Sequence, residues 1–320
     1  MGIDGRVMSL QERKHIILAS PRGFCAGVVR AIETVKLVLK NHGAPVYVLH
    51  EIVHNKHVLH ELEQLGAIFV EGLTDIPRGE ICIFSAHGVS VRVEEMAKKL
   101  GLRTIDATCP LVSSVHRMVE KFHSMNYDVI IIGHHRHPEV EGTAGRVKGK
   151  VHIVASPEEA RQVQVAGQGL VGFVTQTTLC EDDITTIRKI LFDRFPSIEG
   201  PVSNICYATQ NRQNAVKELA EIVDLLLVVG SKNSSNSNRL REVGSKSGMP
   251  CYLIDDKNDI DPSWLKGVER IGVTAGASAP ERLVEGVIQW MQKRWDITFE
   301  EMKGEEKKVQ FRPAELIDRS

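Results

Sequence analysis

The chain has 320 residues, of which 42% are hydrophobic and 25% are charged, so it is long enough to form two or three domains with a substantial buried core. This composition excludes a disulfide-stapled miniprotein, a collagen-like chain and an intrinsically disordered chain. Lysine plus arginine number 40 against 41 for aspartate plus glutamate, and this balance argues against a nucleic acid or an anionic membrane as the main partner.

The sequence begins with a charged stretch, residues 1–15, which lacks the apolar core of a signal peptide. The apolar runs further along are too short to span a bilayer. We therefore expect a cytoplasmic protein without a membrane anchor. In that compartment the six cysteines are expected to be thiols or metal ligands rather than disulfides.

Short runs of valine, isoleucine and leucine recur along the chain and predict buried strands. In chain order they lie at residues 15–20, 46–51, 67–72, 81–86, 129–134, 151–156, 171–176, 225–230, 251–256 and 270–275. The runs do not alternate with polar residues, which is typical of parallel strands that are covered on both faces. Between them apolar residues recur every three or four positions, as at Val28, Ile32 and Val35, and this spacing predicts helices. Strands alternating with helices indicate an α/β fold.

A repeated plan emerges when the spacing is counted from three cysteines, Cys25, Cys109 and Cys206. Each is followed by a helical pattern, a strand with a polar residue at its end, and a later strand that also ends in a polar residue. These polar ends are His50 and His87 in the first repeat, His137 and Thr177 in the second, and Ser234 and Ser278 in the third. We therefore predict three similar α/β domains with mostly parallel sheets, related by pseudo-threefold symmetry about a common centre.

The repeats also suggest domain boundaries. They place the first domain at residues 27–109, the second at 110–203 and the third at 204–300. The third repeat lacks a closing strand, and the N-terminal segment 14–26 has the form to supply it. Residues 301–320 are a C-terminal tail outside the repeats.

The three repeat cysteines and the polar strand ends are expected to meet in one site, because ligands bind beyond the carboxyl ends of parallel strands. Cys109 precedes Pro110, a residue favoured at the first helical position, so its thiolate would lie at a helix N-terminus. Three thiolates around one metal centre leave a coordination position open. The spacing alone does not decide between a [4Fe-4S] cluster with one open iron and a catalytic zinc ion.

Two loops predict proton and anion chemistry. The loop at residues 133–142 is rich in histidine and contains Glu139, a candidate proton donor. The loop that starts at Ser234 and Ser235 precedes a predicted helix and offers hydroxyls, amides and backbone N–H groups to an anion. Neither a P-loop pattern nor a GxGxxG motif follows any of the predicted strands. This disfavours ATP and dinucleotides as ligands.

A series of long motifs occurs in order along the chain. They are PRGFCAGV at 21–28, HEIVHN at 50–55, SAHGV at 85–89, DATCPLV at 106–112, HPEVEGT at 137–143, TQTTL at 175–179, ICYATQNRQ at 205–213, GSKNSSNSNRL at 230–240 and VTAGASAP at 273–280. With these motifs the chain resembles the 4-hydroxy-3-methylbut-2-enyl diphosphate reductase family of iron–sulfur enzymes, from residue 15 to residue 295.

The resemblance implies three α/β domains around a central [4Fe-4S] cluster, with Cys25, Cys109 and Cys206 as its ligands. The substrate's diphosphate would be held by His50, His87, His137, Ser234, Ser235, Asn236 and Ser278. Thr177 and Glu139 would lie near the substrate's hydroxyl group, with Glu139 as the catalytic acid.

The resemblance also implies the reaction, which is the reductive dehydroxylation of (E)-4-hydroxy-3-methylbut-2-enyl diphosphate to isopentenyl and dimethylallyl diphosphate. This is the last step of non-mevalonate isoprenoid biosynthesis. Because the sequence has no nicotinamide or flavin motif, a ferredoxin or flavodoxin is the expected electron donor. Two alternatives remain at this point, namely a zinc-dependent hydrolase on the same three cysteines and a non-catalytic phosphate-binding or redox-sensing module.

Overall fold

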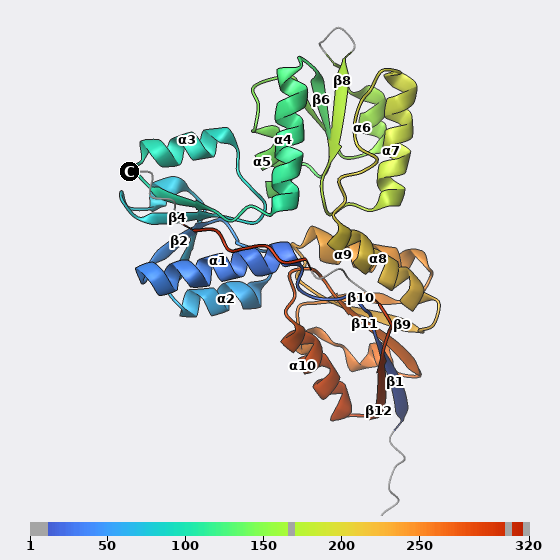
Figure 1. Ribbon diagram of the computed structural model, residues 1–320. Helices are drawn as coiled ribbons and strands as arrows, with labels where there is room; N and C mark the ends of the chain where they lie inside the picture. Colours follow the sequence, from blue (N-terminus) through green and yellow to red (C-terminus); the bar gives the residue numbers. More distant parts are fainter. Residues whose placement is uncertain (1–11, 166–169, 305–308, 316–320) are drawn as a thin grey trace, which may run out of the picture.

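The computed structural model describes residues 12–165, 170–304 and 309–315. Its strands form sheets of five, four and three strands, and the pairs within each sheet are parallel. Figure 1 shows the three sheets, each with its own helices, as three lobes around a common centre. The predicted α/β class is therefore confirmed.

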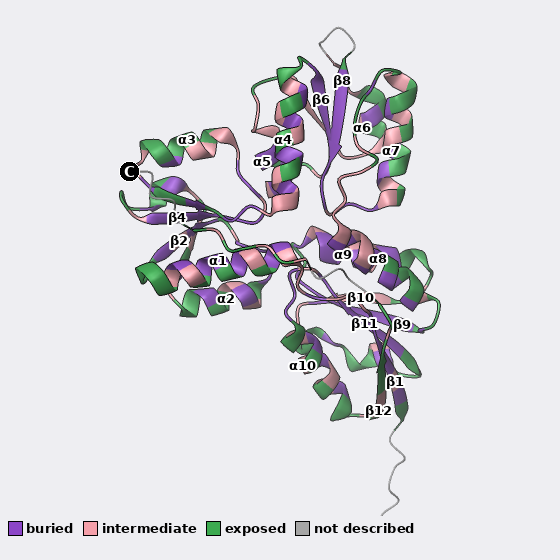
Figure 2. Ribbon diagram, in the orientation of Figure 1, coloured by how far each residue is buried: buried purple, intermediate pink, exposed green. Residues whose placement is uncertain are grey.

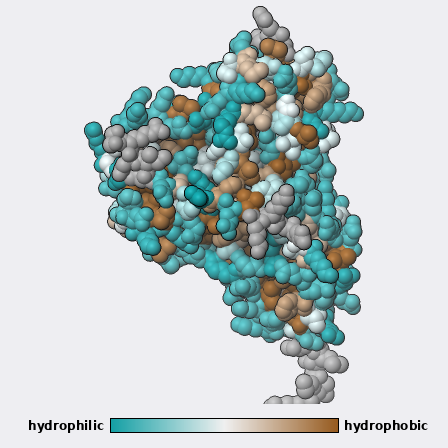
Figure 3. Space-filling view, in the orientation of Figure 1, coloured by the Kyte–Doolittle hydropathy of each residue, from teal (hydrophilic) through white to brown (hydrophobic). Residues whose placement is uncertain are grey.

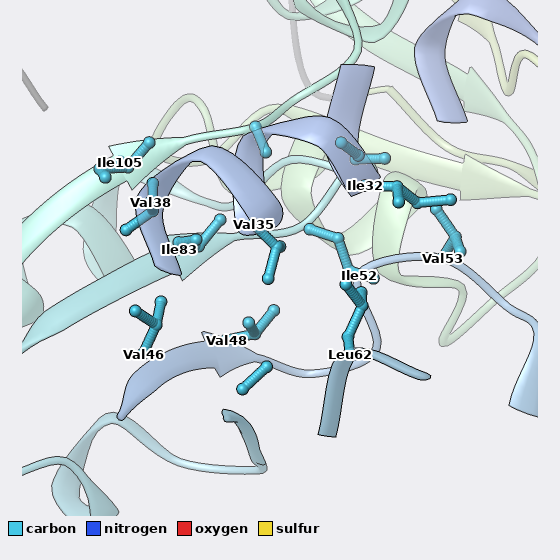
Figure 4. Packing of buried hydrophobic residues seen from close by; sticks show 14 of the residues in the cluster. Ile32, Val35, Val38, Val46, Val48, Ile52, Val53, Leu62, Ile83 and Ile105 are labelled. Atoms are coloured by element: carbon cyan, nitrogen blue, oxygen red, sulfur yellow. The ribbon is translucent and has the colours of Figure 1, made fainter. Parts of the chain in front are cut away.

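The first sheet has the strand order β3-β2-β4-β5. Its strands are β2 (Val46–Leu49), β3 (Ala67–Val70), β4 (Ile81–Phe84) and β5 (Arg103–Asp106), and its helices are α1 (Ala26–His42), α2 (Lys56–Gln64), α3 (Val91–Lys99) and the short 3₁₀ helix η1 (Leu73–Asp75). Figure 4 shows Ile32, Val35 and Val38 of α1 pointing at the apolar face of the strands. The other face packs against α3 and η1. Since both faces are covered, the strands carry unbroken apolar runs.

The second sheet has the order β7-β6-β8. It consists of β6 (Asp128–Ile132), β7 (Val151–Val154) and β8 (Val171–Thr175), with helices α4 (Pro110–Ser124), α5 (Pro138–Ala144), α6 (Pro157–Gln162) and α7 (Glu181–Arg194). Helices α4 and α5 cover one face and α6 and α7 the other. All residues of β6 and β8 are buried.

The third sheet has the order β10-β9-β11-β1-β12 and joins the two ends of the chain. Its strands are β1 (Arg13–Leu18), β9 (Leu225–Val229), β10 (Cys251–Ile254), β11 (Arg270–Ala275) and β12 (Asp296–Glu301). Its helices are α8 (Tyr207–Ala220), α9 (Ser235–Lys246), α10 (Glu281–Gln292) and the 3₁₀ helices η2 (Lys257–Asp259) and η3 (Pro262–Leu265). Strand β1 lies between β11 and β12. Helix α10 covers one face, and α8 and α9 cover the other.

The C-terminal segment connects the third sheet to the first. After β12, Met302 packs against the α8–α9 face of the third sheet. Further on, Ala314 packs on the core of the first sheet, and its backbone N–H donates to Thr34 Oγ1 of α1 at 2.9 Å. Met302 and Ala314 therefore lie on different lobes. The predicted domain boundaries stay a prediction.

Burial follows this architecture. Figure 2 shows the strands buried through most of their length and the helices exposed on their outer sides. In the space-filling view of Figure 3 hydrophilic side chains cover most of the visible face, with apolar residues scattered among them. Within the described ranges, no helix has the length and apolar character needed to cross a membrane.

Candidate active site

A cavity of about 110 Å³ is lined by residues from all three lobes. Most of the polar residues singled out in the sequence line it, namely Cys25, Cys109, Cys206, His87, His137, Glu139, Thr177, Ser234, Ser235, Asn236 and Ser278. We call this cavity the central pocket. Two larger cavities, of about 460 and 430 Å³, share lining residues with it, and both include His54.

Each of the three pocket cysteines precedes a helix. Cys25, Cys109 and Cys206 are the N-cap residues of α1, α4 and α8, and none of these helices has an acidic residue in its first turn. A helix N-terminus favours a negative charge. The backbone N–H of Thr209 donates to Cys206 Sγ at 3.4 Å, which is a contact of this kind.

The thiols nevertheless lack a cationic partner in the pocket. Burial raises the pKa of Cys109 to about 12 and that of Cys206 to about 11, and the neighbouring Cys25 adds to both shifts. No lysine or arginine is among the residues that line the central pocket. Three thiolates at this position would therefore need metal cations to balance their charge.

Gly27 keeps space open between two of the sulfurs. A Cβ atom at this position would lie 2.6 Å from Cys109 Sγ and 3.9 Å from Cys25 Sγ. Every other residue type would therefore intrude on the space beside both cysteines. A glycine in the first turn of a helix lowers helix stability, so its presence indicates that this space matters.

Three histidines form an aromatic cluster on one side of the central pocket. The rings of His54 and His87 stack at 4.3 Å between centroids, and His137 meets both rings edge-on at 5.9 Å. Burial lowers the pKa of His137 to about 4 and, together with the neighbouring histidines, lowers that of His87 well below its usual value. The lowered pKa values favour neutral imidazoles at His87 and His137, and an anion beside them would help to protonate them.

The structure does not bring His50 to the central pocket, so its placement there was wrong. His50 has a left-handed φ of 57°, and its ring pairs with Glu71 Oε2 at 3.2 Å outside the pocket. Four residues later in the same loop, His54 lines the central pocket in its place. The motif HEIVHN contains both histidines, and the strand-end count favoured the first because it ignored the turn that follows β2.

Glu139 is a buried acid with both oxygens occupied. It lies in the first turn of α5 and is only 3% exposed. The backbone N–H of Thr177 donates to Oε1 at 2.6 Å, and the Thr177 hydroxyl donates to Oε2 at 2.9 Å. Desolvation outweighs these two contacts and raises the pKa of Glu139 to about 7. A substantial fraction of the side chain is therefore protonated near neutral pH.

The loop before α9 presents polar atoms to the pocket. Ser234 caps the helix by accepting from the backbone N–H of Ser237 at 3.3 Å. Both polar atoms of the Asn236 side chain are buried and have no partner among the described residues. Buried amides are normally paired, so this side chain has hydrogen-bonding capacity to offer a polar ligand. Thr178, which the sequence analysis did not single out, links to this loop by donating to Ser235 Oγ at 3.0 Å.

Comparisons with known proteins show the family of the chain. The family model described as LytB protein matches residues 16–292. A protein of Desulfotalea psychrophila named 4-hydroxy-3-methylbut-2-enyl diphosphate reductase is 65% identical over 96% of this chain and 98% of its own length. A protein of the same name from Zymomonas mobilis is 52% identical over 93% of this chain and 88% of its own.

Solved structures are similar as well. The E-1-hydroxy-2-methyl-but-2-enyl-4-diphosphate reductase of Plasmodium falciparum matches with a TM-score of 0.87 and 40% identity, covering 94% of this chain and 95% of its own. A structure titled (E)-4-hydroxy-3-methyl-but-2-enyl diphosphate reductase, the terminal enzyme of the non-mevalonate pathway, matches with a TM-score of 0.62 and 34% identity, covering 88% of this chain and 99% of its own.

Proposed function

The chain belongs to the LytB protein family, and from this membership we propose how its central pocket carries out the family's reaction. The reaction is the reduction of 4-hydroxy-3-methylbut-2-enyl diphosphate in the last step of the non-mevalonate pathway. The allylic C–O bond breaks, two electrons and two protons are consumed, and water leaves with isopentenyl or dimethylallyl diphosphate as the product. One observation carries this proposal, namely that three cysteines, a buried acid and neutral anion donors line one cavity.

We infer that Cys25, Cys109 and Cys206 hold an iron–sulfur cluster of the [4Fe-4S] type. Their buried thiols have no cationic side chain beside them, so metal cations would supply the missing charge. When bound, the cluster would supply electrons one at a time and an iron without a protein ligand as a Lewis acid. Gly27 leaves the space beside two of the sulfurs that such a group would need.

A zinc-dependent hydrolase on the same cysteines is the alternative, and the arrangement of the side chains favours it less. Among the described residues no group of three or more histidine, cysteine, aspartate or glutamate side chains is close enough together to hold one metal ion. A cluster binds each thiolate through a different iron and so spans a wider separation. Iron, sulfide and zinc analysis of anaerobically purified protein separates the two alternatives.

Substitution of Gly27 by alanine tests whether the cluster needs the open space beside Cys25 and Cys109. Gly27→Ala is expected to lower the iron content of the purified protein, because its Cβ would lie 2.6 Å from Cys109 Sγ. This close contact opposes the gain of up to about 1 kcal/mol that alanine brings as the better helix former. Gly286→Ala in α10 is the matched control, since the nearest atom to its new Cβ is a flexible side-chain carbon at 3.9 Å. An equal iron content in the two purified variants would contradict the proposal that Gly27 leaves room for the cluster.

We propose that the substrate's diphosphate lies against the histidine cluster and the loop before α9. Its donors would be His54, His87, His137, Ser234, Ser235, Asn236 and Ser278, with His54 replacing the predicted His50. Two observations support this position. The Nε2 atom of His54 and both polar atoms of Asn236 are buried without a partner in the described part of the chain. Anionic oxygens would accept a hydrogen bond from the Nδ2 amide of Asn236, and from Nε2 of His54 when this nitrogen carries a hydrogen.

Glu139 would supply the proton with which the substrate hydroxyl leaves as water. Because Oε1 accepts from the backbone N–H of Thr177, the acid proton would lie on Oε2, next to Thr177 Oγ1. The ionised carboxylate accepts from the Thr177 hydroxyl, whereas the protonated acid donates to it and frees the threonine hydrogen for the substrate. The threonine hydroxyl can pass a proton from this oxygen to the leaving hydroxyl. The raised pKa of Glu139, about 7, suits a general acid that works near neutral pH.

The electrons would come from a ferredoxin or flavodoxin in the cytoplasm, which we propose as the location of the chain. The decisive experiment is anaerobic turnover of the substrate with an artificial one-electron reductant, with iron and sulfide measured on the same sample. We expect both five-carbon diphosphates to form on cluster-loaded protein. A fully loaded protein that forms neither product would overturn the proposed reaction.

A further inference from the structure

His54 is held from outside the central pocket by a carboxylate that does not line it. Glu51 Oε2 lies 2.7 Å from His54 Nδ1, and contact with this imidazole lowers the pKa of Glu51. An ionised carboxylate can only accept a hydrogen bond, so Nδ1 carries the proton. The ring is thereby fixed with its other nitrogen, Nε2, buried and unpartnered within the described residues.

The same carboxylate oxygen also contacts the third lobe. The side-chain amide of Asn233 donates to Glu51 Oε2 at 2.8 Å. Asn233 directly precedes Ser234, Ser235 and Asn236, the loop proposed to hold the other side of the diphosphate. Glu51 therefore connects two groups of anion donors that lie on different lobes and far apart in the sequence.

Further contacts join the first and third lobes close to His54. Ser278 Oγ donates to the backbone carbonyl of His54 at 2.9 Å. Two residues beyond His54, Lys56 Nζ pairs with Asp255 at 2.8 Å. The loop that carries His54 is thus attached to the third lobe at several points, and Glu51 is the attachment that reaches the imidazole itself.

We propose that Glu51 is a positioning residue. It orients the His54 ring toward the substrate's diphosphate and fixes the position of His54 relative to the loop that follows Asn233. This inference rests on the proposed function of the central pocket. When both ring nitrogens carry a hydrogen, Nδ1 donates to the Glu51 carboxylate and Nε2 donates to an anionic oxygen. Glu51 thus acts through His54 and does not touch the substrate.

The test compares Glu51→Gln with a matched control, Glu71→Gln. Glu71 makes the same type of contact, with His50 Nδ1 at 3.2 Å, but neither residue lines the central pocket. In cluster-loaded protein we expect Glu51→Gln to raise KM, and the Kd for inorganic diphosphate, about 10-fold or more, as for other residues that orient a ligating histidine. The contact between His54 and the diphosphate is expected to be equally strong in the ground state and the transition state. We therefore expect kcat to change by less than about threefold.

A double-mutant cycle with Asn233→Ala tests the connection between the lobes. If Glu51 and Asn233 act as one unit, their combined effect on the Kd for diphosphate is smaller than the product of the single effects. Diphosphate affinity in Glu51→Gln that equals or exceeds that of Glu71→Gln would overturn the proposal, since removing a negative charge alone favours an anion. The binding comparison holds whether or not the wild-type chain turns over its substrate, so a failure of the proposed reaction is recognised separately.

Discussion

Replacement of Cys109 by serine is expected to abolish turnover and to remove most of the iron, the sulfide and the visible absorbance of the anaerobically purified protein. Cys109 Sγ lies in the pocket beside Gly27 and faces the same cavity as Cys25 and Cys206. Serine preserves the size of the side chain and is a good helix N-cap, so α4 should begin as before. The loss would therefore report the missing thiolate ligand rather than a missing helix.

The chain offers a close control in Cys180. This cysteine is also the N-cap residue of a helix, α7, but it lies in the core against the third sheet and does not line the central pocket. Cys180→Ser is expected to keep a full complement of iron and sulfide, about four of each per chain for a [4Fe-4S] cluster. Full cluster content in Cys109→Ser, or a loss of similar size in both variants, would contradict the ligand assignment.

The parts of the fold that could be predicted from sequence are those in which burial alone determines the pattern. Unbroken apolar runs such as the one in β9 mark strands covered on both faces, and the structure has them as parallel strands. Strand β12 was not predicted, because it is a sheet edge whose residues are exposed or half-buried. Its position is determined by pairing with β1 at the other end of the chain, which a local pattern cannot reveal.

The site shows the same limit at the level of single residues. Counting from the strand ends selected His87, His137, Thr177 and Ser278, which all line the central pocket. The count failed at His50, because the chain turns there with a left-handed φ of 57° and comes back to the pocket at Val53 and His54. Spacing identifies the loop, whereas the backbone path within the loop decides which side chain points inward.

Substitution of Glu139 by glutamine is expected to lower kcat about 100-fold or more, the size of effect typical of a lost general acid. Iron content and diphosphate affinity should stay close to the wild type. Glutamine can keep both local contacts, since its Oε1 accepts from the backbone N–H of Thr177 and its amide donates to Thr177 Oγ1. What it lacks is a transferable proton, so the change isolates acid chemistry from packing.

The pH dependence gives a second measurement of the same acid. Because the pKa of Glu139 is raised to about 7, the wild-type kcat is expected to be constant below this pH and to fall about tenfold per pH unit above it. In Glu139→Gln the residual turnover should lack this descending limb. An unchanged limb in the variant would assign the titration to another group and would remove Glu139 from the role of proton donor.

Folding stability should report the same pKa independently of turnover. A carboxyl whose pKa is raised on folding binds its proton more tightly in the native state, so its stabilising effect is complete below the unfolded value of 4.5 and is lost as pH rises through about 7. The full effect is on the order of 3 kcal/mol. Glu139→Gln removes this dependence, so its denaturation midpoint should rise relative to the wild type between pH 5 and pH 8. A difference that does not change with pH would mean that the buried carboxyl is not protonated in the native state, and a neutral acid at Glu139 is the condition on which its catalytic role depends.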